Sequence, residues 1–136
     1  MKDLLQAVYE YISSIPDIQA LVQGRILPVV LPQDRPLPAI VYAPVVANYD
    51  SALQGDTGYV RQTIQFVSHE KTFKKARKLS RLVKKALQDY TGDMNGVEIQ
   101  AVFIKSDYEL NGNTSLKFDT EEYISCIEFE IHYNEK

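Results

Sequence analysis

The side chains that could do chemistry in this chain are few, and their spacing does not form a catalytic pattern. His69 and His132 are the only histidines, and neither lies near a candidate nucleophile in the sequence. Cys126 is the single cysteine, and no basic neighbour is placed to lower its pKa, so we expect a half-buried filler. Glu121 and Glu122 are adjacent, and adjacent side chains of a strand point to opposite faces, so they do not form a carboxylate pair.

Motifs that hold cofactors or metals are also missing from the sequence. It contains no glycine-rich phosphate loop, no Walker pattern, no Cys or His pair at zinc spacing and no Gly-x-Ser-x-Gly elbow. Asp50, Asp56 and Asp119 could meet around a divalent ion, but acids in loops usually stay solvated. The sequence therefore predicts a non-enzymatic protein with no cofactor and no metal.

The one concentrated chemical feature is a basic segment, residues 71–85. It holds eight of the fifteen basic residues and no acid, in a chain whose net charge is −3. From Asp89 to the end there are eleven acids and three bases, so the last third of the chain is acidic. A protein with charge separated in this way can attract another macromolecule at short range, either a neighbouring copy of itself or a polyanion.

Three explanations fit the basic segment. It is a solvated helix face whose aliphatic stems shield apolar neighbours, a surface that meets an acidic protein, or a surface that meets DNA. Like charges four residues apart on a helix repel by about 0.2–0.5 kcal/mol per pair, which favours an external acidic partner. The sequence pI near 5.4 argues against a general attraction to nucleic acid.

Length and composition limit the class of protein. The 136 residues suit one domain, residues 1–136. A domain of this size can bury a core large enough to fold without disulfides or bound metals. A single cysteine excludes an intramolecular disulfide framework and favours a reducing compartment. No segment approaches the roughly 18 apolar residues of a membrane span, and the N-terminus lacks the layout of a signal peptide. We therefore expect no membrane contact.

Hydrophobic periodicity predicts two main helices, one at the N-terminus capped by Asp3 and one over the basic segment, capped by Thr72 and stopped near Gly92. A short second turn follows Pro16, and residues 25–27 are a candidate brief strand. Alternating apolar residues predict four longer strands, at 39–46, 59–68, 97–108 and 120–133. The expected fold is α+β, with a mainly antiparallel sheet of about four strands packed by an N-terminal helix and one long central helix.

Two loops are expected to be mobile, near residues 47–58 and 110–118. The first contains the polar stretch Asn48–Gly58, which is either a disordered hairpin tip or a docking loop that orders on a partner. The candidate interface residues lie in the basic segment, in this loop and in the acidic last strand: Lys71, Lys74, Lys75, Lys78, Arg81, Lys84, Lys85, Tyr49, Asp50, Leu53, Asp56, Glu122, Glu128 and Glu130. Tyr49 and Leu53 are the apolar anchors of the loop.

Several stretches also occur in a familiar order. An amphipathic N-terminal helix leads into residues 15–27 (IPDIQALVQGRIL), Pro32-Gln33 precedes residues 37–42 (LPAIVY), and a glycine-containing loop precedes residues 61–66 (RQTIQF). A helix with Ala76, Leu79, Val83 and Leu87 and two closing strands complete the order. This layout resembles the tail completion or tail terminator proteins of long-tailed bacteriophages (siphoviruses), also called tail-to-head joining proteins. The resemblance spans nearly the full chain, although no single motif is diagnostic.

The resemblance implies a virion assembly protein that is made in the host cytoplasm and ends in the virion, at the head-tail interface. Members of the family form a hexameric ring that caps the head-proximal end of the tail tube and presents a surface to the head connector. Genomic DNA passes through the ring without sequence-specific binding. A subunit of this kind could stay monomeric until it meets the tube.

Within such a ring, the basic helix of one subunit could meet the acidic C-terminal sheet of the next, line the lumen or face the connector. Two alternatives stand beside the tail terminator. One is a small nucleic-acid-binding module that uses the basic helix 71–85. The other is a related neck or head-completion protein.

Overall fold

The computed structural model describes residues 3–29, 36–109 and 123–135. Its elements, in chain order, are α1 (Leu4–Ser13), α2 (Pro16–Val22), β1 (Ile26–Pro28), β2 (Ala39–Ala52), β3 (Gly55–Glu70), α3 (Phe73–Leu87), β4 (Gly92–Met94), β5 (Val97–Glu109) and β6 (Tyr123–Asn134). The strands form one sheet in the order β1-β2-β3-β6-β5-β4. Within the described residues β1 runs parallel to β2, and the other strand pairs are antiparallel.

The expected α+β class and mainly antiparallel sheet are confirmed, whereas the expected number of about four strands is wrong. Of the two additional strands of the described sheet, β1 matches the candidate brief strand at residues 25–27, whereas β4 is not among the expected strands. Each has three residues, which is too few to show an alternating pattern in the sequence. The expected helix stop at Gly92 is also wrong. The helix ends at Leu87, and Gly92 instead opens β4 with a φ of 106°.

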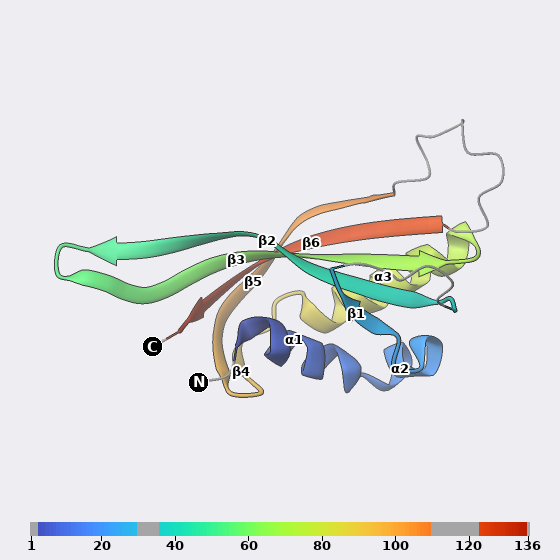
Figure 1. Ribbon diagram of the computed structural model, residues 1–136, viewed down its shortest axis with the longest axis horizontal. Helices are drawn as coiled ribbons and strands as arrows, with labels where there is room; N and C mark the ends of the chain where they lie inside the picture. The colour runs from blue at the N-terminus through green and yellow to red at the C-terminus, as the bar shows by residue number, and fades with distance from the viewer. Residues whose placement is uncertain (1–2, 30–35, 110–122, 136) are drawn as a thin grey trace.

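The three helices cover one face of the sheet, with α3 lying across β3 and β6 (Figure 1). Both expected N-caps are present. The Asp3 carboxylate accepts a hydrogen bond from the Leu5 amide at 3.1 Å, and the Thr72 hydroxyl accepts one from the Lys75 amide at 3.2 Å. Each cap satisfies an amide that has no partner inside its own helix, so these residues fix where α1 and α3 begin.

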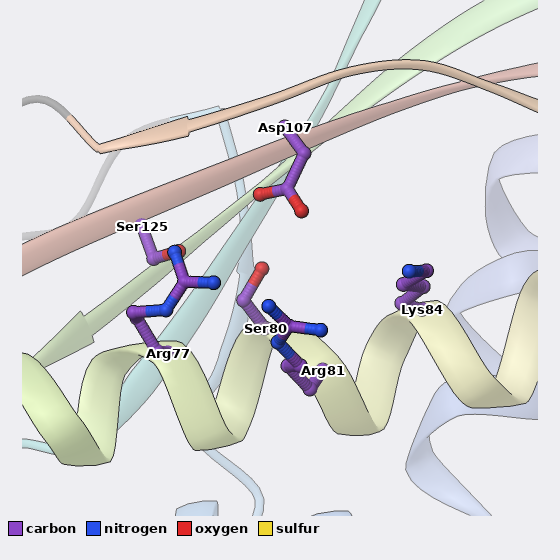
Figure 2. A pocket seen from close by; sticks show the side chains of 6 residues that line it. All are labelled: Arg77, Ser80, Arg81, Lys84, Asp107 and Ser125. Carbon is purple, nitrogen blue, oxygen red and sulfur yellow. The ribbon is translucent and has the colours of Figure 1, made fainter.

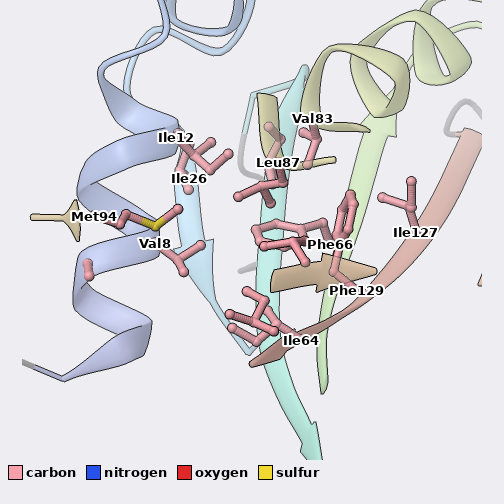
Figure 3. Close-up of a cluster of buried hydrophobic side chains, with 14 of the residues drawn as sticks. Val8, Ile12, Ile26, Ile64, Phe66, Val83, Leu87, Met94, Ile127 and Phe129 are labelled. Carbon is pink, nitrogen blue, oxygen red and sulfur yellow. The ribbon is translucent and has the colours of Figure 1, made fainter. Parts of the chain in front are cut away.

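The core lies between the helices and the inner face of the sheet, which is the face toward the helices (Figure 3). Phe66 of β3 and Phe129 of β6 meet edge to face, with ring centroids 5.9 Å apart. Val83 and Leu87 of α3 are fully buried in the same cluster. The Tyr11 hydroxyl donates to the Ala86 carbonyl at 2.8 Å and ties α1 to α3.

The loop expected at Asn48–Gly58 is wrong, because β2 and β3 continue through it as one long hairpin. Their pairing runs to Ala52 opposite Gly55, and only Leu53 and Gln54 lie between the two strands. The hairpin projects past the ends of the other strands (Figure 1). Cross-strand hydrogen bonding here overrides a polar, glycine-containing composition that is typical of loops. The second expected loop, 110–118, lies outside the described residues.

We expect the Phe129→Ala substitution to lower the free energy of unfolding by about 3–5 kcal/mol, because it empties a fully buried site in the core. Phe103→Ala is the matched control, since Phe103 lies on the same sheet and is 54% exposed. Its cost should stay below about 1 kcal/mol. Urea unfolding followed by circular dichroism measures both, and equal costs would contradict this placement of the core.

Candidate assembly surfaces

The basic segment forms α3 and the residues just before it, as expected. The apolar stripe of α3 faces the sheet through Ala76, Leu79, Val83 and Leu87, which are all buried. The helix therefore turns its cations away from the core. The exposed basic residues are Lys71, Lys74, Lys75, Lys78, Arg81 and Lys85, and Lys84 is half-buried.

Arg77 is the member of the segment that the protein uses internally. Its guanidinium donates to the Glu109 carboxylate at 2.7 Å, and the Ser125 hydroxyl donates to the same oxygen at 2.9 Å. The two ionic side chains are 33% and 16% exposed. Within the described residues no other base of the segment forms an ion pair. Sequence reasoning missed this pair, because Arg77 and Glu109 are 32 positions apart.

Two flanks of α3 carry different cations. On the β5 side, Figure 2 shows Arg77, Arg81 and Lys84 along a crevice that Asp107 and Ser125 also line. On the α2 side, a cavity of about 310 Å³ is lined by Lys71, Lys75 and Lys78. The other lining residues are Ala20, Leu21, Leu37, Pro38 and the buried Glu70. The basic surface is thus wide, and it wraps the exposed half of the helix.

The described acids of β6, Glu128 and Glu130, lie on the outer face of the sheet, away from the helices, and are half-buried. Glu130 accepts from His132 at 2.7 Å and lies 3.5 Å from the Lys105 ammonium. Glu128 accepts from the Tyr108 hydroxyl at 3.2 Å and from Gln65 at 3.5 Å. Glu122 lies outside the described residues. These carboxylates are already engaged within their own subunit, so the outer face is a weaker acidic surface than the sequence implies.

The hydrogen bond from His132 lowers the pKa of Glu130, and Lys105 adds to this effect against the opposing influence of burial. His132 in turn contacts the Tyr59 hydroxyl through its Nδ1 atom. A polar row of Tyr59, His132, Glu130 and Lys105 therefore crosses β3, β6 and β5 on the outer face.

Cys126 is fully buried, not half-buried as expected, and its role as a packing residue fits this position. Burial raises the pKa of its thiol to about 11. A thiol with so high a pKa is almost entirely protonated at neutral pH and is a poor nucleophile.

The hairpin displays the expected apolar anchors. Tyr49 is 62% exposed, and Leu53 is fully exposed at the turn. Asp50 is exposed next to them, and the backbone of Asp56 lies in β3. On the described strands, sequence reasoning missed three further exposed apolar side chains: Val45, Val46 and Phe103. Their only signal was strand alternation, which does not tell which face of a strand a partner covers.

The structure keeps the three groups of candidate residues apart. The basic helix lies on the inner side of the sheet, Glu128 and Glu130 lie on its outer face, and the hairpin tip lies beyond one end. The described residues contain no cluster of three or more metal-ligating side chains. No helix among them is long and apolar enough to span a membrane. Their arrangement therefore offers separate contact surfaces rather than one convergent site.

Comparison with known families gives these surfaces a context. The family model described as "Tail completion protein gp17" matches residues 6–117, which is most of the chain. The chain belongs to this tail completion family. The resemblance noted in the sequence is thereby confirmed, and membership of the family indicates a role in phage tail assembly.

A solved structure has the same fold as this tail completion protein. The matching chain comes from the "Virion of native gene transfer agent (GTA) particle", at a TM-score of 0.66 and 14% sequence identity. The match covers 96% of this chain and 94% of the other. No curated protein sequence matches the chain. The architecture is therefore shared with a protein of a virion particle at low sequence identity.

We expect Arg77→Gln to lower the free energy of unfolding by about 1 kcal/mol, because the Glu109 carboxylate loses a partly buried partner. Lys78→Gln, at the next position of the same helix, removes an exposed cation and should change stability by less than about 0.5 kcal/mol. Chemical denaturation of both variants distinguishes the structural cation from a surface cation. A larger cost for Lys78→Gln would contradict the assignment.

We expect Glu130→Gln to destabilise the protein at pH 7 by up to about 1 kcal/mol. Because folding lowers the Glu130 pKa, the ionised carboxylate stabilises the fold above its unfolded pKa, and this contribution is lost as pH falls through the folded value. The difference between wild type and variant should therefore shrink on acidification below the ordinary value of 4.5. Thermal unfolding at pH 7 and pH 3 measures it, with the exposed Glu98→Gln as control.

Proposed function

We propose that this protein is a non-enzymatic virion assembly protein that forms a ring on the head-proximal end of a phage tail tube and joins the tail to the head connector. Its partners are further copies of itself, six in all, the tail tube protein and the connector or stopper protein. The genome passes through the ring without sequence-specific contacts. The protein acts in the virion at the head-tail interface, after assembly in the host cytoplasm.

The observation that carries this proposal is membership of the tail completion family together with surfaces suited to docking. Among the described residues, the basic segment has six exposed cations and no ion pair beyond that of Arg77. An exposed helix that serves only its own fold gains from mixing both signs, and this helix does not mix them. The exposed apolar hairpin adds a second contact surface, with Tyr49 and Leu53 as its anchors.

The placement of the charges favours a particular use of the basic helix. The helix layer and the outer sheet face lie on opposite sides of the sheet, so copies arranged side by side do not bring α3 against Glu128 and Glu130. The helix layer of such copies is left free for another acidic surface. We therefore propose that α3 meets the tube or the connector, where charge speeds and orients docking.

A second candidate function is nucleic-acid binding, and the exposed cations of α3 favour it. Phosphate contacts made by Lys and Arg release counterions, so affinity for duplex DNA would fall steeply with salt. The chain's net charge of −3 opposes such binding away from the helix. Fluorescence anisotropy with a DNA duplex at 50 mM and 200 mM salt separates this candidate from the assembly role.

Adding the protein to polymerising tail tube protein from the same genome should stop tube growth and leave a ring at one tube end. Negative-stain electron microscopy of tube lengths, with and without the protein, measures both effects. Capped tubes should be shorter, and the distribution of their lengths should be narrower. Unchanged lengths with bare ends would remove the capping role, and binding to the connector protein would then be tested directly.

Neutralising Lys74, Lys78, Arg81 and Lys85 together to Gln should leave the fold intact and abolish docking, because all four are exposed cations of α3. The matched control replaces Arg61, a cation of β3 that lies away from α3, with Gln. Circular dichroism checks the fold, and the same microscopy scores capping. Normal capping by the fourfold variant would reject the charge argument while leaving the family assignment in place.

A further inference from the structure

The described residues leave two stretches of equal length uncovered at the edges of the sheet. The short strand β1 pairs with β2 only at residues 40–42, and β4 pairs with β5 only at residues 92–94 against 97–99. Beyond these points the described residues place no strand outside β2 over residues 43–52 or outside β5 over residues 100–109. We call these stretches the β2 edge and the β5 edge. Each leaves a row of backbone groups free to pair with another strand.

Both edges carry exposed apolar side chains, although the β2 edge also contains Pro44 and the β5 edge contains Lys105, Asp107 and Glu109. Proteins protect open edges mostly with lysine and other charges, but the β2 edge contains no base and one acid, Asp50. Of the eight large apolar side chains that are most exposed in the described residues, five lie on the two edges or at the hairpin turn: Val45, Val46, Tyr49, Leu53 and Phe103. Apolar exposure is therefore concentrated where the backbone is also unpaired.

The directions of the two edges suit each other in neighbouring copies. Through the antiparallel pairs of the sheet, β2 runs opposite to β5. A copy rotated about an axis along the strands would thus bring its β2 edge antiparallel to the β5 edge of the first. In the register of the sheet, β1 reaches the level of Asp107 and β4 begins at the level of Tyr49, so the two flanking strands lie at opposite ends of the contact. Between these levels, residues 43–48 of β2 can face residues 101–106 of β5 without obstruction.

We propose that the β2 edge of one copy pairs antiparallel with the β5 edge of a second copy of this chain, in a head-to-tail contact that continues the sheet from subunit to subunit. The proposal rests on the ring function above and names the contact that builds the ring. A head-to-tail contact either closes into a ring or grows into a filament. A closed ring leaves no open edge, and this gives the assembly a definite end.

The register of the sheet places one apolar side chain from each edge on the same face. Val46 lies opposite Thr63, Thr63 opposite Glu130, and Glu130 opposite Phe103. Val46 and Phe103 therefore both lie on the outer face, one at each edge of the sheet. Their side chains are 45% and 54% exposed. Pairing of the edges would bury each of these side chains against a neighbouring subunit.

Irregularities on both edges would disfavour pairing between free subunits. The β2 edge has register shifts at Pro44/Val46 and Tyr49/Ser51, and the β5 edge has shifts at its start and at Ile104/Ser106. Bulges weaken the pairing of isolated edges. Side-by-side placement on a tube end would supply the additional contacts that free subunits lack.

Hydrogen-deuterium exchange of the free protein and of the assembled ring tests the contact. We expect alternate amides of both edges to exchange at least about tenfold more slowly in the ring, because only alternate amides of an edge face the new strand. An assembled ring without protection at the edges would overturn the proposal and leave the ring function standing. Protection of the β2 edge alone, seen only with tube protein, would also overturn it and assign the hairpin to the tube. Failure to assemble or to cap tubes would reject both proposals.

A pair of introduced cysteines, Val46→Cys and Phe103→Cys, provides a second test. The two positions lie three strand spacings apart in one subunit, about 14 Å, which is too far for an intramolecular disulfide. Oxidation of assembled protein should give a ladder of cross-linked subunits when both cysteines are present. Dimers from Val46→Cys alone would indicate a symmetric contact and overturn the head-to-tail arrangement.

Substitution of the edge gives the matched functional comparison. Val46→Lys should reduce the assembled fraction at least about tenfold with little change in thermal midpoint, since a lysine on an edge blocks pairing. Gln6→Lys, at an exposed position of α1 away from both edges, should assemble normally. Equal assembly by the two variants would count against pairing of the β2 edge with the β5 edge.

Discussion

The packing of α3 against β3 and β6 is the contact on which the other surfaces of this protein depend. Leu79, Val83 and Leu87 fill the inner face of the sheet together with Phe66 and Phe129. Because this stripe is committed to the core, the cations of α3 have no position other than the opposite side of the helix. Loss of the contact would remove both the core and the fixed direction of the basic surface.

The same contact determines which parts of the sheet remain accessible to partners. With its inner face covered by helices, the sheet presents its outer face and its edges. The outer face is largely occupied by the protein's own polar row, in which Glu130 binds His132 and Lys105. The edges keep unpaired backbone and exposed apolar side chains such as Val46 and Phe103. Charge and apolar contact are thus separated in space, and these two kinds of surface suit different partners.

Features that depend on residues close together in the sequence could be predicted, whereas features that depend on distant residues could not. The helices, their caps at Asp3 and Thr72 and the class of the fold could be predicted, because they depend on residues a few positions apart. The strands β1 and β4 escaped a firm prediction, since three residues carry almost no periodic signal. The hairpin through residues 48–58 was expected as a loop because its composition is polar, but each strand there is stabilised by its partner across the sheet.

The candidate site divides in the same way. The sequence by itself determined that one helix concentrates the positive charge, that Tyr49 and Leu53 are available as anchors, and that the chain resembles tail completion proteins. Only the tertiary structure decided that Arg77 is held by Glu109, that Glu128 and Glu130 lie across the sheet from the basic helix, and that two edges of the sheet are open. The physical reason is that charge and periodicity are local properties of a chain, whereas pairing, burial and the face on which a side chain lies are set by residues far away in sequence.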